Sequence, residues 1–453
     1  MQPLPKEFEE QMKRLLGEAG FFAYLDALNQ PYTRALRVNL LLRPDGTPPC
    51  PIEGLGAPVP WAKGAYFIEG DARPGLSPLH EGGLFYMQEP SALTAVTALD
   101  PQPGERVLDL CAAPGGKSTQ IAALMAGRGL LCCNEPIPSR AQILSRNIER
   151  MGVRNAVVLS AMPDALAPRF PAFFDRILVD APCSGEGMFR RQPEARDEWD
   201  ADAPRRCADR QMEILAQAAK MLRPGGTMVY STCTFNDTEN EGVLRRFLAL
   251  HPEFSLVPFA LPGLPEAKDG YLHLYPHEMR GEGHFVSRLK KADGADEADA
   301  PVQAAPQRKA PARAAAKGKA PALIALPDVI SDAFAPERLY TAGDALWMLP
   351  EGISIERLSS LRVLRTGLLL AHAEGKRSEP DHALAMALRP EEAARTASLT
   401  QTQALAYQAG ETLSLGDLPS GYTLLCCEGV SLGWGKQAGG LMKNHYPKGL
   451  RRR

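Results

Sequence analysis

Two cysteines occupy equivalent places in the sequence, because each directly follows a short apolar run that is typical of a buried strand. Cys183 lies in the segment DAPCSG, which begins at Asp180, and Cys233 lies in STCT, residues 231–234. A lone cysteine is most often a buried structural thiol, but two at matching strand ends favour a site. A thiolate is a strong nucleophile. These residue types therefore predict covalent chemistry assisted by a carboxylate.

A third polar loop, DLCAAPGGKS, begins at Asp109 after another apolar run and leads into a predicted helix. Small residues there let backbone N–H groups approach a ligand at the positive end of the helix. The tail Gly116–Ser118 is similar to a phosphate-binding P-loop, but Cys111 stands where that motif needs its first glycine. Glu135 follows about twenty residues later, where doubly wound nucleotide sites place an acid for ribose hydroxyls. The loop and Glu135 predict an adenosine-type cofactor without a metal.

Methylation of a cytosine at carbon 5 would use both thiols and such a cofactor. Attack of a thiolate at C6 makes C5 an enamine-like carbon, which can take a methyl group from a sulfonium donor. A carboxyl group near N3 and the exocyclic amine would stabilise the developing charge. The residues alone allow either Cys233 or Cys183 to be the nucleophile, and the other thiol would then assist product release.

The elements around these loops alternate between strand and helix over residues 104–291, which predicts an α/β, doubly wound, Rossmann-like core. In such a sheet the carboxyl ends of the strands share one edge, so the three loops should converge. We expect strands at 106–110, 130–134, 157–159, 176–180, 227–232 and 283–289, and helices near 118–125, 139–151 and 204–222.

The composition limits the partners and the compartment. The 51 basic and 53 acidic side chains nearly balance, so any nucleic-acid surface must be a local patch. No signal peptide and no membrane-spanning apolar run is recognisable. The nine cysteines lack metal-ligand spacing, and without an export signal they are expected to be reduced thiols. We therefore expect a cytoplasmic, monomeric protein without a metal or a membrane partner.

Composition also divides the chain. An Ala/Pro-rich stretch at 292–323 lacks large apolar residues and predicts a flexible linker. We expect five parts in all: an N-terminal α+β RNA-contact region at 1–85, the core at 86–291, this linker, a small C-terminal α/β domain at 324–398, and an RNA-binding domain at 399–453.

The three loops, DLCAAPGGKS, DAPCSGEGMFRR and YSTCTFNDTENE, resemble those of the nucleolar-protein/Sun family of RNA cytosine-C5 methyltransferases over residues 88–289. The closest branch is the bacterial one that modifies 16S ribosomal RNA of the small subunit. The resemblance implies S-adenosyl-L-methionine as cofactor, Cys233 as the nucleophile that bonds to C6, Cys183 as the residue that assists release, and Asp180 facing the base and the methyl group. It also implies that the cofactor contacts Cys111, Ala112, Ala113, Pro114, Gly115, Gly116, Lys117, Glu135 and Asp180.

One position departs from the family pattern. Many members have an acid near the adenine after the strand that ends at Leu159, whereas this chain has Met162 there. Either Asp164 replaces that acid or Met162 packs on the adenine, so we expect both beside the cofactor.

RNA contacts are expected in two places. Near the core they are Arg37, Asn39, Arg190 and Arg191. In the last domain, which resembles a PUA-like β-barrel, they are Lys436, Lys443 and Lys448, with Trp434 and Tyr446 positioned to stack on unpaired bases.

Two alternatives stay open at this point. One is a cytosine-C5 methyltransferase that acts on transfer RNA. The other is a non-catalytic RNA-binding factor for ribosome assembly. The latter predicts a broken cofactor loop or the loss of Cys233, but this sequence has an intact cofactor loop and has Cys233.

Overall fold

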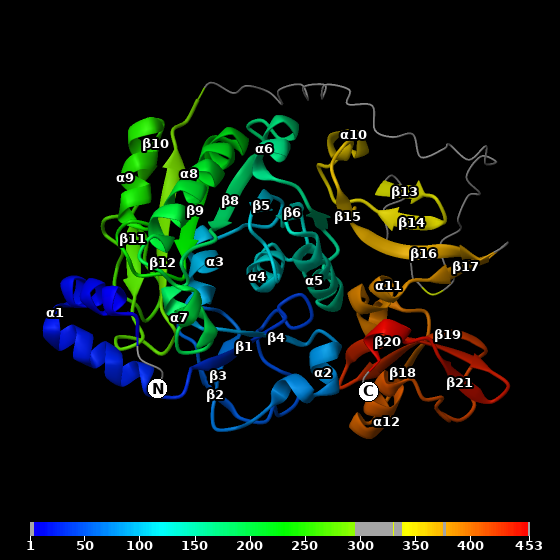
Figure 1. Ribbon diagram of the computed structural model, residues 1–453. Helices are drawn as coiled ribbons and strands as arrows, with labels where there is room; N and C mark the ends of the chain where they lie inside the picture. Colours follow the sequence, from blue (N-terminus) through cyan, green and yellow to red (C-terminus); the bar gives the residue numbers. More distant parts are fainter. Residues whose placement is uncertain (1–3, 295–328, 330–337, 375–376, 452–453) are drawn as a thin grey trace.

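A nine-stranded sheet forms the centre of the computed structural model, which describes residues 4–294, 329, 338–374 and 377–451. Its strand order is β10-β12-β9-β8-β5-β6-β7-β15, with β11 paired to β12 (Figure 1). The parallel part consists of β5 (Arg106–Asp109), β6 (Leu130–Asn134), β7 (Ala156–Leu159), β8 (Phe174–Asp180) and β9 (Leu222–Thr232). The chain runs outward from β5 to one edge and then returns to the other side, as a doubly wound core requires.

Apolar side chains on alternate positions of these strands pack into two separate clusters, because successive residues of a strand point to opposite faces. One cluster joins the strands to α3 (Thr94–Leu99), α4 (Gly116–Leu124) and α5 (Pro138–Arg150). The other joins them to α8 (Ala203–Met221) and α9 (Glu241–Leu250). Burial on both faces explains why the parallel strands are nearly continuous apolar runs, and it confirms the predicted fold class.

Antiparallel strands complete both edges of this sheet. At one edge lie β10 (Phe254–Leu256), β11 (Tyr271–Leu274) and β12 (His284–Lys291). At the other edge β15 (Val363–Arg365), from the C-terminal part of the chain, pairs with β7. The Ser160 N–H extends this pairing by donating to the Arg362 carbonyl at 2.9 Å. The C-terminal part therefore contributes a strand to the core.

The N-terminal region consists of a kinked helix and a small antiparallel sheet. Helix α1 (Lys6–Leu28) kinks at Gly17, whose φ of 70° a residue with a side chain rarely adopts. The sheet has the order β2-β3-β1-β4, with β1 (Arg34–Val38), β2 (Leu55–Pro58), β3 (Ala65–Ile68) and β4 (Phe85–Gln88). Strand β1 ends at Val38, because Asn39 starts a turn in which its carbonyl accepts from the Leu42 N–H at 3.0 Å.

Two further four-stranded sheets lie in the C-terminal part. One has the order β13-β14-β16-β17, formed by β13 (Leu339–Ala342), β14 (Ala345–Met348), β16 (Leu368–Glu374) and β17 (Arg377–Pro380). The other has the order β18-β19-β20-β21, formed by β18 (Thr396–Ser398), β19 (Gly421–Cys427), β20 (Val430–Ala438) and β21 (Leu441–Asn444). The other α-helices are α2 (Pro78–Glu81), α6 (Pro163–Leu166), α7 (Glu194–Glu198), α10 (Ile355–Leu358), α11 (His382–Ala387) and α12 (Gln401–Ala409).

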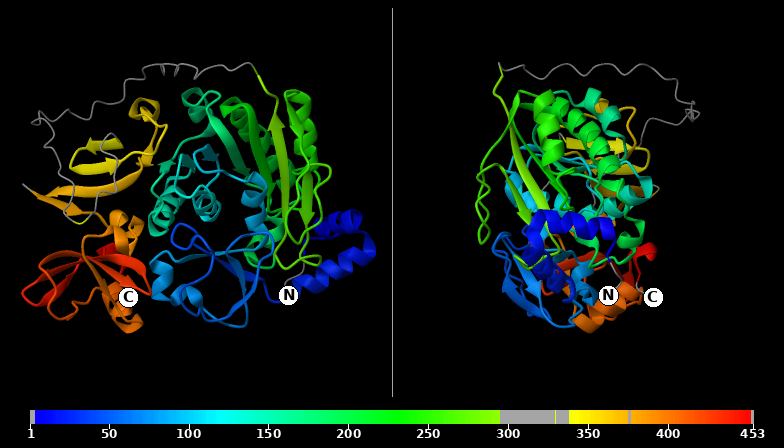
Figure 2. Two further views of the ribbon diagram at one scale, coloured as in Figure 1. Left: turned by 180° about the vertical axis from the view of Figure 1, so that it is seen from behind. Right: turned by 60° about the vertical axis from the view of Figure 1, so that its left-hand side comes forward.

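The last domain shares an apolar cluster with the N-terminal region, and Figure 2 shows the two side by side. Leu79 and Phe85 of the N-terminal region belong to the same cluster as Tyr407 and Leu432 of the last domain. The buried Gln408 side chain also donates to the Pro78 carbonyl at 3.0 Å. This packing differs from the loose attachment expected from the linker sequence. Most of that linker, residues 295–323, lies outside the described residues.

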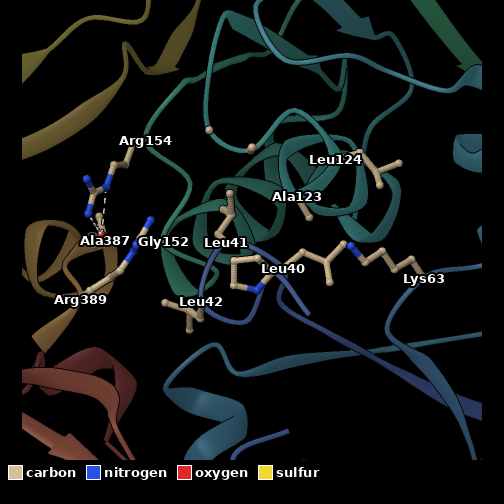
Figure 3. Close-up of a pocket in the computed structure, with 13 residues that line it drawn as sticks. Leu40, Leu41, Leu42, Lys63, Ala123, Leu124, Gly152, Arg154, Ala387 and Arg389 are labelled. Carbon is tan, nitrogen blue, oxygen red and sulfur yellow. Dashed lines mark hydrogen bonds between the residues drawn. The ribbon is translucent and has the colours of Figure 1, made fainter. Parts of the chain in front are cut away.

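A hollow of about 370 Å³ lies where the N-terminal region, the core and the small C-terminal domain meet (Figure 3). The loop at 40–42 lines it with three leucines, and Leu41 packs against the same apolar cluster as Leu124 at the end of α4. On one side Arg154 donates to the Ala387 carbonyl and pairs with Glu392, joining core and C-terminal domain. No residue that lines this hollow lines the cleft described below.

Candidate active site

The three polar loops meet in one cleft of about 1220 Å³ at the carboxyl ends of the parallel strands. Cys111 follows β5, Asp180 ends β8, Cys183 follows it, and Cys233 follows β9. Strands β8 and β9 are parallel neighbours with Asp180 opposite Ser231, so the loops after them start side by side. The predicted convergence follows from this register.

The two thiols lie in contact, with 3.3 Å between the Cys183 and Cys233 Sγ atoms. The hydrogen bond to Cys233, together with burial, raises the pKa of the Cys183 thiol well above its usual value. Cys183 is therefore a protonated thiol at neutral pH while it faces Cys233. It can donate its S–H to the neighbouring sulfur, which would stabilise a thiolate there.

The Asp180 carboxylate has three polar or basic side chains around it in the cleft. Its Oδ2 accepts from Lys117 Nζ at 2.8 Å, its Oδ1 accepts from Ser231 Oγ at 2.8 Å, and His284 Nε2 lies 3.5 Å from Oδ1. Burial alone would raise the pKa of Asp180, but Lys117 and His284 outweigh it and hold that pKa well below its usual value. Asp180 also raises the pKa of Lys117 against the effect of burial. Both groups are charged at neutral pH.

The loop after β5 turns sharply into α4. Gly115 has φ of 113°, a conformation that favours glycine, and a side chain on Gly116 would come within 3.2 Å of the Tyr86 ring. Asp109 sits beneath the loop and accepts from Ser118 Oγ at 2.7 Å. Burial raises the pKa of Asp109 to about 7 despite that hydrogen bond. The loop backbone is thereby fixed at the N-terminus of α4.

The far side of the cleft begins at the end of β6. The Glu135 side chain is 3% exposed, accepts from the Ile137 N–H at 3.0 Å and lies 3.5 Å from Arg140 Nη1. Met162 and Asp164 both line this side and both are exposed, so the structure brings each of the two candidates beside Glu135. No group of three metal-ligating side chains was found among the described residues.

Arg37 and Asn39, two of the residues expected to contact RNA near the core, are buried instead. Arg37 is 1% exposed and donates to Thr119 Oγ1 at 2.8 Å and to the Gly116 carbonyl at 3.2 Å. Burial lowers the pKa of Arg37 to about 10. Asn39, also 1% exposed, donates to the carbonyls of Gly83 and Met151 at 2.9 and 3.0 Å. Both residues fasten the N-terminal sheet to the core.

Arg190 has a comparable position on the other side of the core. Its guanidinium pairs with the buried Glu282 carboxylate, with Nε 2.8 Å from Oε2, and Nη1 donates to the Ala27 carbonyl at 2.8 Å. Arg190 therefore connects α1 to the segment before β12, and it offers no free guanidinium to a phosphate. Arg191, next in the chain, is exposed.

In the last domain the lysines and the aromatic residues behave differently. Trp434 and Tyr446 are buried, and Trp434 Nε1 donates to the Asp381 carbonyl at 2.8 Å, so the expected stacking of these rings on bases is wrong. Lys436 and Lys443 lie opposite each other on β20 and β21, and Lys436 Nζ lies 4.6 Å from the centre of the Tyr422 ring. Lys443 and Lys448 are exposed.

Three residues that support the cleft without lining it were not among those predicted from the sequence. His284 carries no motif signal, because it lies in a strand added from beyond the parallel core. Glu239 and Asn236 lie inside the segment after Cys233 and hold the two cysteine loops together. Their proximity to Cys233 in the sequence was the available signal, but the partner loop is visible only in the fold.

This fold and this cleft place the protein among Rossmann-like methyltransferases that use S-adenosylmethionine. One solved structure that it resembles is a methyltransferase homologue from Pyrococcus horikoshii, 30% identical, with a TM-score of 0.54 over 63% of this chain and 95% of that chain. No helix of the described residues has an apolar stretch long enough to span a membrane.

Family comparisons cover nearly the whole chain. The model for the 16S rRNA methyltransferase RsmB/F matches residues 96–290. The models for the RsmF N-terminal domain, first C-terminal domain and PUA domain match residues 4–90, 327–388 and 394–452. Ribosomal RNA small subunit methyltransferase F of Erwinia tasmaniensis is 34% identical over 98% of this chain and 96% of its own, and the protein of that name from an Enterobacter species is 35% identical over 98% and 95%. The chain belongs to the 16S rRNA methyltransferase RsmB/F family.

The residues of the cleft fit the cofactor of this family. Glu135 offers a carboxylate to ribose hydroxyls, and the backbone after Cys111 lies at the positive end of α4. Ile137 and Met162 line the same side with side chains that are 48% and 61% exposed, which suits packing against an adenine ring. The charged pair Lys117–Asp180 borders the thiols, where the amino-acid end and the methyl group would lie.

Proposed function

We propose that this protein methylates carbon 5 of a cytosine in the 16S ribosomal RNA of the small subunit, through a covalent bond between Cys233 Sγ and cytosine C6. The contact of 3.3 Å between the two thiols, in the same cleft as the cofactor loop, carries the proposal. The names of the family and of its relatives support ribosomal RNA as the substrate.

In the proposed reaction the Cys233 thiolate attacks C6 and forms the S–C6 bond. S-adenosylmethionine supplies the methyl group as a sulfonium donor. The electron pair that the attack delivers to C5 forms the new C5–methyl bond. Removal of the C5 proton then re-forms the C5–C6 double bond, and the S–C6 bond breaks to return the Cys233 thiolate.

Cys183 is proposed to assist that last elimination. Its pKa is raised first by the hydrogen bond to Cys233 and then by burial and the charge of that neighbour. Once Cys233 is bonded to C6 it is a neutral thioether, so both effects of Cys233 on the pKa of Cys183 disappear. Cys183, which lines the cleft, can then lose its proton to solvent more easily, and its thiolate accepts the C5 proton. This order of events favours Cys233, rather than Cys183, as the nucleophile.

Asp180 and Lys117 are proposed to hold the base. Because Asp180 is ionised, its carboxylate can accept from the exocyclic amine of cytosine, while Lys117 balances its charge. The thiol and the methyl donor act on the ring of the target base, so that base must be unpaired or flipped out of a helix.

The remaining assignments belong to the same proposal. The cofactor would contact residues 111–117, Glu135, Asp180 and either Met162 or Asp164. RNA would contact Arg191 near the core and the lysines of the last domain, Lys436, Lys443 and Lys448. We also propose a monomer that works in the cytoplasm, where both thiols stay reduced, and domain limits at 1–85, 86–291, 292–323, 324–398 and 399–453.

Denaturing gel electrophoresis after incubation with labelled S-adenosylmethionine and 16S RNA, both free and in assembled subunits, tests this proposal. Cys183→Ala should form a stalled protein–RNA adduct, and Cys233→Ala should give neither adduct nor methylation. Cys207→Ala is the matched control, because Cys207 also lines the cleft but belongs to α8 rather than to either cysteine loop. It should turn over like the wild type.

The gel also separates the alternatives. An adduct that depends on Cys183 would reverse the two roles. Methylation of transfer RNA in preference to 16S RNA would identify the other substrate class. Binding of 16S RNA with no methyl transfer by the wild type would indicate an assembly factor and end the proposal.

A further inference from the structure

We infer that Glu239 is a positioning residue that sets Cys183 against Cys233, and that it acts on the release of the product rather than on the attack. This inference rests on the proposed function. Glu239 is fully buried in the segment after Cys233 and does not line the cleft.

Four hydrogen-bond donors from three segments converge on the Glu239 carboxylate. Ser184, next to Cys183, donates through its N–H at 3.0 Å and through its hydroxyl. Asn236 donates from the segment after Cys233 at 2.8 Å, and Gln211 donates from α8 at 2.9 Å. One side chain thereby joins the two cysteine loops to the helix that packs beneath them.

Cys183 is held on both sides by this arrangement. Gln211 Nε2 also donates to the Pro182 carbonyl at 3.1 Å, directly before Cys183, while Glu239 holds Ser184 directly after it. Tyr230 OH in turn donates to Gln211 Oε1 at 2.9 Å and contacts the Glu239 carbonyl, so Gln211 cannot turn without loss of a buried hydrogen bond.

Cys233 depends less on Glu239. It follows β9 directly, and its carbonyl accepts from the Gly187 N–H at 2.8 Å. Loss of Glu239 should therefore displace Cys183 more than Cys233. In the proposed reaction Cys183 is needed when the C5 proton leaves, so elimination should slow more than attack.

A carboxylate is required at this position because all four groups that face it are hydrogen-bond donors. All four donors are neutral and point toward Glu239, and an ionised carboxylate accepts hydrogen bonds without donating any. A glutamine would direct an NH₂ group toward Ser184, Gln211 or Asn236, each of which also donates. Glu239→Gln is therefore not conservative at this position, and it should open the contact between the loops.

The test measures adduct formation and adduct release separately, in single-turnover reactions of the full-length protein with S-adenosylmethionine and 16S RNA. Glu239→Gln should form adduct at a rate within about threefold of the wild type but release it between about tenfold and a hundredfold more slowly, since small misplacements of a reacting group have effects of this size. In the double variant with Cys183→Ala, the release rate should equal that of Cys183→Ala alone, because Glu239 acts through Cys183.

Glu186→Gln is the matched control. Glu186 is equally buried and accepts from Gln11 at 2.9 Å, from the Phe235 N–H at 2.8 Å and, like Glu239, from Asn236, here at 3.1 Å, but it accepts from neither Ser184 nor Gln211. Its melting temperature should fall while its release rate stays within about twofold of the wild type. If Glu239→Gln does not fold, Ser184→Ala removes one donor and should slow release in the same direction by a smaller factor.

Release at the wild-type rate in Glu239→Gln, or an equal slowing in Glu186→Gln, would overturn the inference. Effects of Glu239→Gln and Cys183→Ala that multiply would overturn it as well. These results leave the proposed function intact as long as Cys183→Ala accumulates adduct and Cys233→Ala forms none. Methylation by Cys233→Ala would instead remove the proposed function itself.

Discussion

The strand-end loops and the residues near the core that were expected to contact RNA make an instructive comparison. Both sets were assigned functions from the sequence, yet the fold brings the loop residues into one cleft and buries Arg37, Asn39 and Arg190 in domain contacts. The register of parallel strands fixes where their carboxyl ends lie. No comparable rule directs an arginine toward solvent, because its side chain can satisfy buried carbonyls and carboxylates equally well.

The largest effect is expected from a substitution in the strand-end loops, at the proposed nucleophile Cys233. Cys233→Ser keeps the shape of the side chain but replaces the thiolate with a hydroxyl that is far less acidic. Methyl transfer to 16S RNA should fall on the order of 10³-fold or more, while the melting temperature changes little. Single-turnover transfer of labelled methyl groups measures this. Residual transfer within tenfold of the wild type would mean that Cys233 forms no bond to the base.

Arg190 should show the opposite behaviour, with a loss of stability. Arg190→Ala leaves the Glu282 carboxylate buried without its guanidinium partner, and such a change costs about 3–5 kcal/mol of unfolding free energy. Urea unfolding measures it. The double variant Arg190→Met with Glu282→Leu should recover much of the loss, since no buried charge is left unpaired. If Arg190→Ala instead weakened RNA binding and left the stability unchanged, Arg190 would be an RNA contact rather than a structural residue.

The pH dependence of stability tests whether Asp180, at the start of one strand-end loop, is ionised in the folded protein. The pKa of Asp180 is held below its ordinary value by Lys117 and His284. Its contribution to stability is therefore complete above the unfolded pKa, near 4, and is lost as the pH falls below that value. Asp180→Asn should flatten the acid side of a plot of unfolding free energy against pH. It should leave the slope between pH 6 and 8 unchanged. If the difference in unfolding free energy between the wild type and Asp180→Asn instead changed with pH near neutrality, Asp180 would not be ionised in the folded state.

The smallest effect is expected at the exposed lysines. Lys443→Ala should leave stability unchanged and weaken RNA binding modestly, with the slope of log affinity against log salt reduced by about one unit. Fluorescence anisotropy with an RNA fragment at several salt concentrations measures this. Lys63→Ala, which removes an exposed lysine beside the hollow of Figure 3, is the control and should not alter the slope. A change in stability without a change in slope would mean that Lys443, like Arg190, stabilises the fold and does not contact RNA.

The sequence predicted the parallel core well because its information is local. The strand 106–110 and the helix 204–222 correspond to β5 (Arg106–Asp109) and α8 (Ala203–Met221), because the apolar pattern that predicts each element lies within its own segment. The strand β15 was not predicted, because it pairs with β7 across about two hundred residues. Likewise the lysines near Trp434 in the sequence suggested an RNA-stacking ring, but Trp434 is buried through contacts with Asp381 and Tyr407. Contacts distant in sequence decide those positions.

The apolar cluster shared by the N-terminal region and the last domain sets an order for biosynthesis. Residues 36–85 leave the ribosome first, but their cluster is completed only by residues 399–446. Domains usually fold as units while the chain is still being made. This N-terminal sheet must instead wait for almost the whole chain, with Leu36, Leu79 and Phe85 uncovered on a nascent surface. A message truncated before the last domain would therefore yield a chain that aggregates, even though every residue of the catalytic cleft has been translated.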